Sequence, residues 1–546
     1  MKSSVKHILF LLILSYAFFM LGNNLVPLSD PDEVFYAQTA REMSLRHEWN
    51  VPFLFGQPQF EKPIFLYWLL RIAFLMFGVT PYAARFFPAV FATLGVIAVY
   101  LLALLGFNNK KKALICAIVL ASNIIYIGLG RTVFTDMVFS VFILFAMLSF
   151  FWGYSVQKNK NTGLILFFLF AGLATLTKGP LGIILPLISA GLFLAANKNI
   201  KFLFTYGFLA GIAVFAAVSL PWYVYIIAKY GNSFISEFFY NDHIRRLLFA
   251  EHLGGDTWYF YLGSIFGLFF PWSFFLAAAA YRLIRTRPAL SPMYQFLIWW
   301  IAVVFVVFQM AHSKLIAYVV PLFPALALMC GDYITDLLDN PARKTVGKGL
   351  LLLSWATAII AACIGANIVG FKLKLLSDTI ALVWAYAAVV LIWLLTMLFF
   401  ILKNHLRPAV YMLSVTLPLF LFAGPVNREK TDAYLSIESI SACLQEQPVS
   451  KGLILASKPF ARGVLYYTNR EVAVFAPDEP NFFSPHPVPF LDTHEKIFGF
   501  LRKNGITYCV IKKKQTNELQ EIAKRIGFKS ELLLSSGSAC LLKVQP

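Results

Sequence analysis

Charged residues are scarce in this chain. They make up 13% of its 546 residues, whereas soluble domains contain about 25%. Hydrophobic residues account for 59%, and the mean hydropathy is +0.71. This composition lies outside the range of soluble domains. The length of 546 residues also exceeds what one soluble core can contain. Together they predict an α-helical polytopic membrane protein, a large bundle of helices with one modest additional domain.

The sequence marks of several site types are also missing. The six cysteines show no metal-ligand spacing, and three lie in apolar stretches and three near the C-terminus. They therefore predict neither a zinc site nor a disulfide framework. No glycine-rich nucleotide loop, long internal repeat or low-complexity linker is present. The missing loop fits a reaction that uses no nucleotide cofactor.

Acidic residues are few, 27 against 46 basic ones, which leaves a formal net charge of +19. Such an excess can indicate nucleic-acid binding, but that requires basic residues clustered on one face. Here they occur in short groups between apolar runs. This distribution favours the positive-inside rule of membrane proteins and predicts a lipid bilayer, with no nucleic-acid partner.

Apolar runs long enough to cross a bilayer, about 17–25 residues, occur thirteen times. The first follows Lys2 and Lys6 and is not followed by a small-residue cleavage site, so we interpret it as a retained helix. The fifth and sixth meet at Lys178-Gly179-Pro180, which would alternatively break one bent element. The predicted spans are 7–25, 82–106, 113–130, 133–154, 163–177, 179–196, 202–228, 258–281, 292–311, 315–335, 349–370, 380–402 and 408–424.

Loop charges orient these spans. With the N-terminus inside, every predicted inner loop carries at least two basic residues, and the short outer loops carry few. An odd number of spans then places the C-terminus outside. We predict a membrane domain over 1–426, with outer loops at 26–81 and 229–257. A small α/β domain is predicted over 427–546, because strand-like runs such as 452–456 alternate there with helical stretches.

The densest outer charge cluster is Ser29-Asp30-Pro31-Asp32-Glu33. Helix capping explains part of it: Asp30 is a good N-cap, Pro31 suits the first helical position, and Glu33 completes a capping-type arrangement. Asp32 is less well explained by capping. A functional role is the alternative explanation for Asp32, beside helix capping.

Further outer charges flank the apolar spans, where charge is expensive and usually has a purpose. Lys62, which follows Glu61, would serve as a phosphate ligand near a helix start. The stretch from Phe65 to Leu69 is expected to form an amphipathic helix lying on the outer leaflet. Asp136 lies about one turn into an apolar run, and an ion pair with Arg131 is the competing explanation for it.

Three weaker groups complete the set on this side. They are Asn241-Asp242-His243-Ile244-Arg245-Arg246, His312-Ser313-Lys314 with Tyr318 and Pro321, and Lys178-Gly179-Pro180. Together these acids and bases would suit a phosphate-linked lipid and an acceptor. Basic groups would stabilise a phosphate leaving group, and a carboxylate would act as base or metal ligand.

The motifs resemble those of one group of membrane glycosyltransferases, which includes the protein O-mannosyltransferases and the bacterial aminoarabinose–lipid A transferases. The resemblance covers about residues 1–330 well. The aminoarabinose branch is the more similar, since it shares thirteen spans of the C-type glycosyltransferase fold and a small outer C-terminal domain. The motifs, in order, are Asp32-Glu33 with Tyr36-Ala37 and Arg41-Glu42-Met43, Glu61-Lys62-Pro63 with Tyr67-Trp68, Thr135-Asp136, Thr177-Lys178-Gly179-Pro180, and Ser313-Lys314-Leu315 with Tyr318 and Pro321.

This resemblance implies roles for individual residues. Asp32 would be the principal catalytic carboxylate and Asp136 a second essential acid. Glu61 and His243 would bind a divalent metal ion. The carrier phosphate would be held by Lys62, Lys178, Tyr318 and either Arg245 or Arg246.

The implied reaction inverts the anomeric centre by moving a sugar from undecaprenyl phosphate to lipid A or another cell-envelope acceptor. It would take place at the outer face of a bacterial inner membrane. With a hydroxyl acceptor Asp32 would be the general base, whereas an anionic lipid A phosphate needs none. The alternatives are a protein O-mannosyltransferase, a transporter or flippase of lipid-linked sugar, and an assembly subunit with a decayed site. Transporters usually show repeats and midplane charges, which the sequence does not show.

Overall fold

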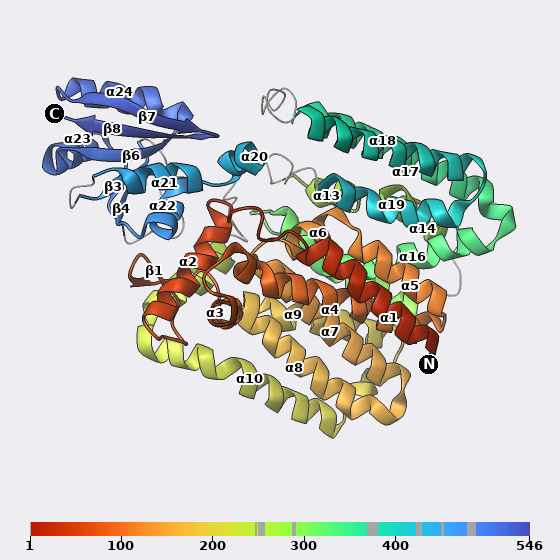
Figure 1. Ribbon diagram of the computed structural model, residues 1–546. Helices are drawn as coiled ribbons and strands as arrows, with labels where there is room; N and C mark the ends of the chain where they lie inside the picture. Colours follow the sequence, from red (N-terminus) through yellow and green to blue (C-terminus); the bar gives the residue numbers. More distant parts are fainter. Residues whose placement is uncertain are drawn as a thin grey trace. The chain divides into compact units, whose positions relative to one another are not determined.

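The computed structural model describes residues 2–245, 248, 257–286, 291–367, 380–421, 428–448, 452–477 and 488–546. The chain forms two compact units (Figure 1). The first is helical and comprises Met1–Leu21, Glu61–Leu66 and Arg85–Ala423. The second comprises Gly22–Phe60, Tyr67–Ala84 and Gly424–Pro546, and it contains the sheets. Each unit is therefore assembled from segments distant in sequence.

The first unit is a bundle of helices. Its helices are α1 (Lys2–Ser15), η1 (Tyr16–Met20), α4 (Pro81–Phe107), α5 (Lys110–Ala121), α6 (Ile124–Gly130), α7 (Thr135–Ser155), η2 (Gln157–Asn159), α8 (Lys160–Lys178), α9 (Leu181–Ala196), η3 (Ile200–Leu203), α10 (Tyr206–Tyr230), α11 (Asn232–Phe234), η4 (Ile235–Arg245), α13 (Phe260–Leu268), α14 (Ser273–Thr286), α15 (Pro292–Gln309), η5 (Ile316–Leu322), α16 (Phe323–Asp339), η6 (Pro341–Arg343), α17 (Lys344–Asn367), α18 (Ile380–Leu402) and α19 (Leu406–Leu421).

Within the described ranges, eight helical segments are long and apolar enough to cross a membrane. The count becomes nine if the pair α5 and α6, bent by 67°, forms one span. The eight are Pro81–Phe107, Thr135–Ser155, Gln157–Lys178, Tyr206–Tyr230, Pro292–Gln309, Ile316–Asp339, Pro341–Ile364 and Trp384–Leu402. The chain is thus a polytopic membrane protein, as predicted.

The predicted number of thirteen spans is matched only in part. The runs at 7–25, 179–196 and 408–424 correspond to shorter apolar helices, Ser4–Met20, Leu181–Ala196 and Leu406–Phe420. The run at 258–281 is divided between α13 and α14. Hydropathy counts apolar residues without regard to breaks, and Pro271 in this gap lacks the N–H that a continuing helix needs. The ends of the runs at 349–370 and 408–424 lie outside the described residues.

The helices α7 and α8 approach each other closely through glycines. A Cβ added to Gly163 on α8 would lie 2.7 Å from the Cα of Gly153 and 2.7 Å from the carbonyl oxygen of Ser149, both on α7. Small residues permit such contact between membrane helices, where association depends on van der Waals packing. The helix pair therefore depends on the absence of a side chain at position 163.

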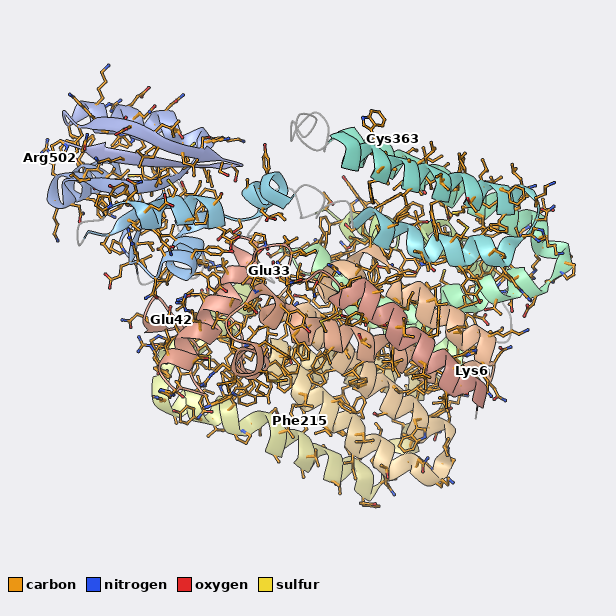
Figure 2. All side chains as sticks on the ribbon, viewed as in Figure 1. Lys6, Glu33, Glu42, Phe215, Cys363 and Arg502 are labelled. Carbon is orange, nitrogen blue, oxygen red and sulfur yellow. The ribbon has the colours of Figure 1, made fainter. Side chains whose placement is uncertain are left out.

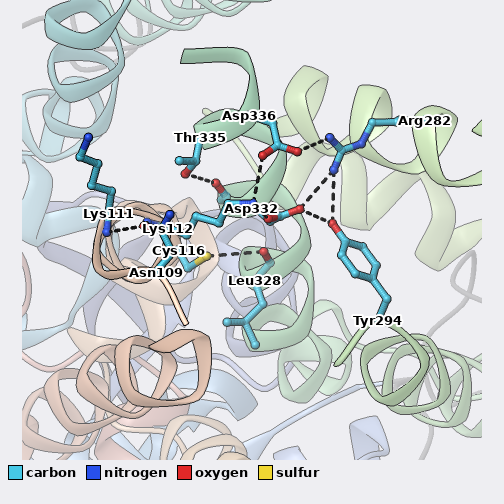
Figure 3. A network of polar contacts seen from close by, with 11 residues as sticks. Asn109, Lys111, Lys112, Cys116, Arg282, Tyr294, Leu328, Asp332, Thr335 and Asp336 are labelled. Carbon is cyan, nitrogen blue, oxygen red and sulfur yellow. Dashed lines mark hydrogen bonds and ion pairs between the residues drawn. The ribbon is translucent and has the colours of Figure 1, made fainter. Parts of the chain in front are cut away.

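An ion-pair network joins α5, α14, α15 and α16 (Figure 3). Lys112 pairs with Asp332 and, at 3.0 Å, with Asp336. Arg282 pairs with the same two carboxylates, at 3.2 and 2.6 Å, and the hydroxyl of Tyr294 donates to Asp332. The two acids are four residues apart and therefore lie on one face of α16. Two cations and two anions from three helices thus neutralise one another, and α15 adds the Tyr294 hydroxyl.

The second unit has a six-stranded sheet in the order β5-β4-β3-β6-β8-β7. The first four strands are parallel, and β8 and β7 continue the sheet in antiparallel fashion. A short hairpin, β1-β2, precedes α3. The elements are α2 (Asp32–Leu45), β1 (Phe53–Leu54), β2 (Gln57–Pro58), α3 (Phe65–Phe77), α20 (Arg428–Leu435), α21 (Glu438–Glu446), β3 (Ile454–Ser457), η9 (Lys458–Phe460), α22 (Ala461–Thr468), β4 (Val472–Phe475), β5 (Phe490–Leu491), α23 (His494–Asn504), β6 (Thr507–Lys512), η10 (Lys513–Gln515), α24 (Thr516–Arg525), β7 (Lys529–Ser536) and β8 (Ala539–Gln545).

Helices cover both faces of this sheet, α21 and α22 on one and α23 and α24 on the other. Strand β3 shows why: Ile454 and Ala456 pack into the first cluster and Leu455 into the second. Alternate side chains of a strand point to opposite faces, so a strand covered on both sides becomes continuously apolar. The predicted α/β domain at the C-terminal end of the chain is confirmed.

The close contact between α7 and α8 makes a prediction about stability. Gly163→Ala should destabilise the folded protein by about 1–3 kcal/mol, because the added methyl group would meet backbone atoms of α7 that cannot move aside. Gly191→Ala on α9 is the matched control, since a Cβ there meets nothing within 4 Å. The measurement is the free energy of unfolding in mixed micelles. Equal stability of the two variants would show that α7 and α8 can separate without loss.

Candidate active site

The helix that carries Asp32 begins at that residue, not earlier. Pro31 occupies the N-cap position of α2 and provides no side-chain hydrogen bond. The predicted N-cap role of Asp30 is therefore wrong: its carboxylate instead accepts a hydrogen bond from the backbone N–H of Ile437. Pro31 is therefore not the first helical residue, and Glu33 reaches back to Ser29 and not to the predicted cap Asp30. It accepts from the N–H and the hydroxyl of Ser29, both at 3.0 Å.

The two acids of the Asp32-Glu33 motif have different surroundings. Glu33 is buried and holds the loop before the helix, whereas Asp32 is exposed on the first turn. Only the exposed carboxylate is accessible to a substrate from solvent. This contrast supports the sequence-based choice of Asp32 for a chemical role and gives Glu33 a structural one.

The other end of α2 organises a turn. Glu33 and Glu42 lie toward opposite ends of the helix (Figure 2). The carboxylate of Glu42 accepts hydrogen bonds from the N–H groups of Phe55 and Gly56, at 3.0 and 2.8 Å. Both turn residues have positive φ, 53° and 77°, and glycine adopts this conformation without steric cost. The later part of the first-loop motif thus orders the β1-β2 hairpin.

In the helical unit, Asp136 and Lys178 form an ion pair. Asp136 lies in the first turn of α7, and Lys178 is the last residue of α8. A carboxylate at a helix N-terminus and an ammonium group at a C-terminus both interact favourably with the helix dipoles. The side chains are 9% and 12% exposed, so the pair is largely out of water. The expected alternative pairing with Arg131 is not found, and Arg131 donates to the carbonyl oxygen of Phe18 instead.

Tyr318 contacts the same lysine. The Lys178 ammonium lies 4.5 Å from the centroid of the Tyr318 ring, which permits a cation–π interaction. The hydroxyl of Tyr261 on α13 donates to the carbonyl oxygen of Leu315 at 3.0 Å and so holds the start of η5. The structure therefore brings together Asp136, Lys178 and Tyr318, which the sequence predicts from three separate motifs.

The remaining predicted residues are placed less completely. Glu61 and Lys62 precede α3, and the Lys62 ammonium donates to the carbonyl oxygen of Glu61 at 2.8 Å. Arg245 is the last residue of η4. The side chain of His243 and the whole of Arg246 lie outside the described residues. Among the residues that the structure describes, no three His, Cys, Asp or Glu side chains are grouped to share a metal ion.

Three contacts, two within the second unit and one within the first, were not anticipated from the sequence. They are the contact of Asp30 with Ile437, the contact of Glu42 with the hairpin turn, and the hydrogen bond of Tyr261 to Leu315. Each joins residues that are distant in the chain or in different elements. For Asp30 and Glu42, the sequence signal was that the region of α2 contains more acidic residues than helix capping requires.

Comparison with known proteins agrees with this architecture. Residues 4–233 match the family model described as dolichyl-phosphate-mannose-protein mannosyltransferase. The chain is 31% identical over 346 residues to the undecaprenyl phosphate-alpha-4-amino-4-deoxy-L-arabinose arabinosyl transferase of Yersinia pestis (strain Pestoides F). It is 32% identical over 349 residues to the enzyme of the same name from Yersinia enterocolitica. The matched region spans 62% of this chain and 62% of each relative.

Solved structures extend the likeness to the whole fold. The crystal structure of ArnT from Cupriavidus metallidurans bound to undecaprenyl phosphate matches with a TM-score of 0.78 at 18% identity, covering 98% of this chain and 97% of that one. The apo structure of the same protein matches with a TM-score of 0.76. The chain is thus similar in sequence to membrane glycosyltransferases, as the motifs predict, over less than two thirds of its length, and it shares its fold with ArnT. The proteins that it resembles include aminoarabinose transferases.

The buried Asp136–Lys178 pair predicts that two aspartate variants differ in stability. Asp136→Asn should destabilise the protein by about 3–5 kcal/mol, because it leaves the Lys178 ammonium without its carboxylate in a low-dielectric site. Asp339→Asn, which removes the partner of Arg407 in a pair with side chains 43% and 58% exposed, should cost less than about 1 kcal/mol. Unfolding in mixed micelles measures both. Similar losses for the two variants would contradict the assignment of a desolvated pair.

Proposed function

We propose that this protein is an inverting glycosyltransferase. It moves a sugar of the aminoarabinose type from undecaprenyl phosphate to lipid A or another cell-envelope acceptor, at the outer face of a bacterial inner membrane. The observation that carries the proposal is the 31% identity over 346 residues to enzymes named for this chemistry. The fold likeness and the motif order support it.

The reaction balances as a single displacement. An acceptor oxygen attacks the anomeric carbon of the sugar, and the bond between that carbon and the phosphate oxygen breaks. The bonding electrons leave with the undecaprenyl phosphate. With a hydroxyl acceptor, the proton passes to Asp32 acting as general base. With an anionic phosphate acceptor there is no proton to remove, and Asp32 orients the acceptor.

Cationic and hydrogen-bonding groups stabilise the leaving phosphate in this proposal. Lys62 provides a point charge, and Tyr318 provides a hydroxyl beside Lys178. Lys178 also holds Asp136, so the essential role proposed for Asp136 is to orient this lysine. Arg245 or Arg246 would add a planar guanidinium, which suits phosphate geometry.

The proposal includes a divalent metal ion only to the extent of naming two candidate ligands for it. Glu61 and His243 would supply a carboxylate and an imidazole to it. No step above passes through the ion, because the His243 side chain lies outside the described residues. Two assays test whether the ion is needed: the activity of Glu61→Gln, and the activity of wild type after chelation and renewed addition of metal.

A protein acceptor is the second candidate, favoured by the description of the matching family model. The two candidates differ in acceptor and not in the donor carrier. Parallel assays with lipid A and with a serine- and threonine-containing peptide distinguish them. Movement of labelled carrier across liposomes without sugar transfer would instead indicate a flippase.

The first functional prediction concerns Asp32. Asp32→Asn should lower kcat by about 10²-fold or more, because the position loses its negative charge while the helix is retained. Asp492→Asn is the matched control, a partly exposed aspartate that pairs with Lys496 next to the start of α23. The assay uses purified protein in detergent with an undecaprenyl-phosphate sugar donor and lipid A. Full activity of the Asp32 variant would remove Asp32 from the proposed mechanism.

The second concerns the carrier phosphate. Lys62→Gln should raise KM for the donor by about tenfold, as expected for one lost hydrogen bond to a charged group. Lys403→Gln removes an exposed charge from the same helical unit and should leave KM unchanged. Equal KM values for the two variants would argue against a phosphate contact at Lys62.

A further inference from the structure

The loop before Asp32 is hydrogen-bonded to the C-terminal part of the second unit. The N–H of Asp30 donates to the carbonyl oxygen of Leu435 at 2.9 Å. The N–H of Ile437 donates to the Asp30 carboxylate at 3.0 Å. Asp30 is separated from Ile437 by 407 positions in the chain, but from Asp32 by only two. The start of α2 is thus bound to the segment that joins α20 and α21.

A second set of contacts runs beside the first. The Ser436 hydroxyl donates to the hydroxyl of Tyr467, which donates in turn to the carbonyl oxygen of Leu28, at 3.0 and 3.1 Å. Further along α2, Arg41 donates to the carbonyl oxygen of Tyr466 at 2.8 Å. Helix α2 is therefore held against α22 both before its first turn and in its last third.

Gly463 on α22 completes the contact with Asp30. A Cβ at Gly463 would lie 2.1 Å from the Oδ1 atom of Asp30, so only glycine allows the carboxyl group its position. That oxygen is buried and has no hydrogen-bond partner among the described residues. We refer to Asp30, Leu435, Ile437, Gly463 and Tyr467 as the α2 anchor.

We propose that the C-terminal α/β domain positions the reactive carboxylate of the transferase: through the α2 anchor it fixes the first turn of α2 and with it Asp32. Asp30 acts in this proposal as a positioning residue, since it reaches substrate only through Asp32. The inference rests on the proposed function of Asp32. It assigns a role to a domain that carries no chemical motif of its own.

The ionisation of Asp30 gives the anchor a pH dependence. Burial raises the pKa of Asp30 to about 8. The hydrogen bond from Ile437 lowers this pKa, and the nearby charge of Glu33 raises it further. The raised pKa favours the neutral acid form of Asp30 in the anchor. Its contribution to stability is complete below the unfolded pKa of 3.8 and is lost as the pH rises through about 8. Other ionisable groups lie on the elements packed here. They include Asp32, Glu33, Arg41 and Glu42 on α2, Asp432 on α20, Glu438 on α21, and Arg462, Tyr466 and Tyr467 on α22.

The first test compares two glycines of the C-terminal domain. Gly463→Ala inserts a methyl group against Asp30, whereas Gly499→Ala on α23 inserts one where nothing lies within 4 Å. We expect Gly463→Ala to lower kcat at least about tenfold, because small misplacement of a reactive group is costly. Binding of undecaprenyl phosphate and the donor KM should stay within about twofold of wild type. Gly499→Ala should match wild type in all three.

The second test uses pH. Wild-type activity should fall as the pH is raised through about 8. Asp30→Asn keeps an acceptor for the Ile437 N–H but cannot ionise, so its activity should persist across that range. Asp30→Ala should lose activity at every pH. Tyr467→Phe, which removes one hydroxyl, should lose less than Gly463→Ala.

Hydrogen exchange separates the anchor from the chemistry. Amides of α2 should exchange faster in Gly463→Ala and Asp30→Ala, while those of β6 and of the helical unit stay protected. Faster exchange in α2 with unchanged kcat would overturn the positioning role. Unchanged exchange in α2 would overturn the anchor itself. If wild type transfers no sugar with any donor, the proposed function fails, and the exchange data still decide whether the anchor exists. If Gly463→Ala unfolds the sheet, Asp30→Asn and Tyr467→Phe carry the test.

Discussion

The high free energy of a charge removed from water is the constraint on which the rest of this structure depends. Asp136 and Lys178 satisfy it by pairing where α7 begins and α8 ends, so that the helix dipoles support both charges. Lys112 and Arg282 satisfy it with two acids on one face of α16. These pairs join α7 to α8 and join α5 and α14 to α16, and Lys178 also contacts Tyr318 on η5.

The same constraint separates structural acids from reactive ones. Glu33 and Glu42 on α2 use their carboxylates to hold backbone N–H groups, and Asp30 is partly buried, with an elevated pKa. Asp32, among these neighbours, is the exposed carboxylate. A motif rich in acids thus resolves into a reactive position and a surrounding framework that keeps it in place.

The fold extends over more of the chain than the sequence match does, 98% against 62%. Contacts made through backbone atoms tolerate such divergence, because every residue provides a carbonyl oxygen and nearly every residue an N–H. Much of the α2 anchor is of this kind, since it uses the backbone of Leu435 and Ile437. The contacts beside it use the backbone of Leu28 and Tyr466. Its side-chain requirements are limited to a few positions, of which Gly463 is the most stringent.

The sequence by itself determined the membrane class, most of the apolar helices, the α/β nature of the C-terminal domain and the likeness to membrane glycosyltransferases. Hydropathy, strand alternation and motif order depend on residues that are close in the sequence, so the sequence alone is enough to recognise them. The tertiary structure decided that Asp136 pairs with Lys178 and not with Arg131, and that the run at 258–281 is two helices. It also decided that Asp30 is an anchor to Ile437 and not a helix cap. Partners of a buried polar group are selected by whichever donors folding brings within about 3 Å, and for Asp30 that donor is 407 positions away.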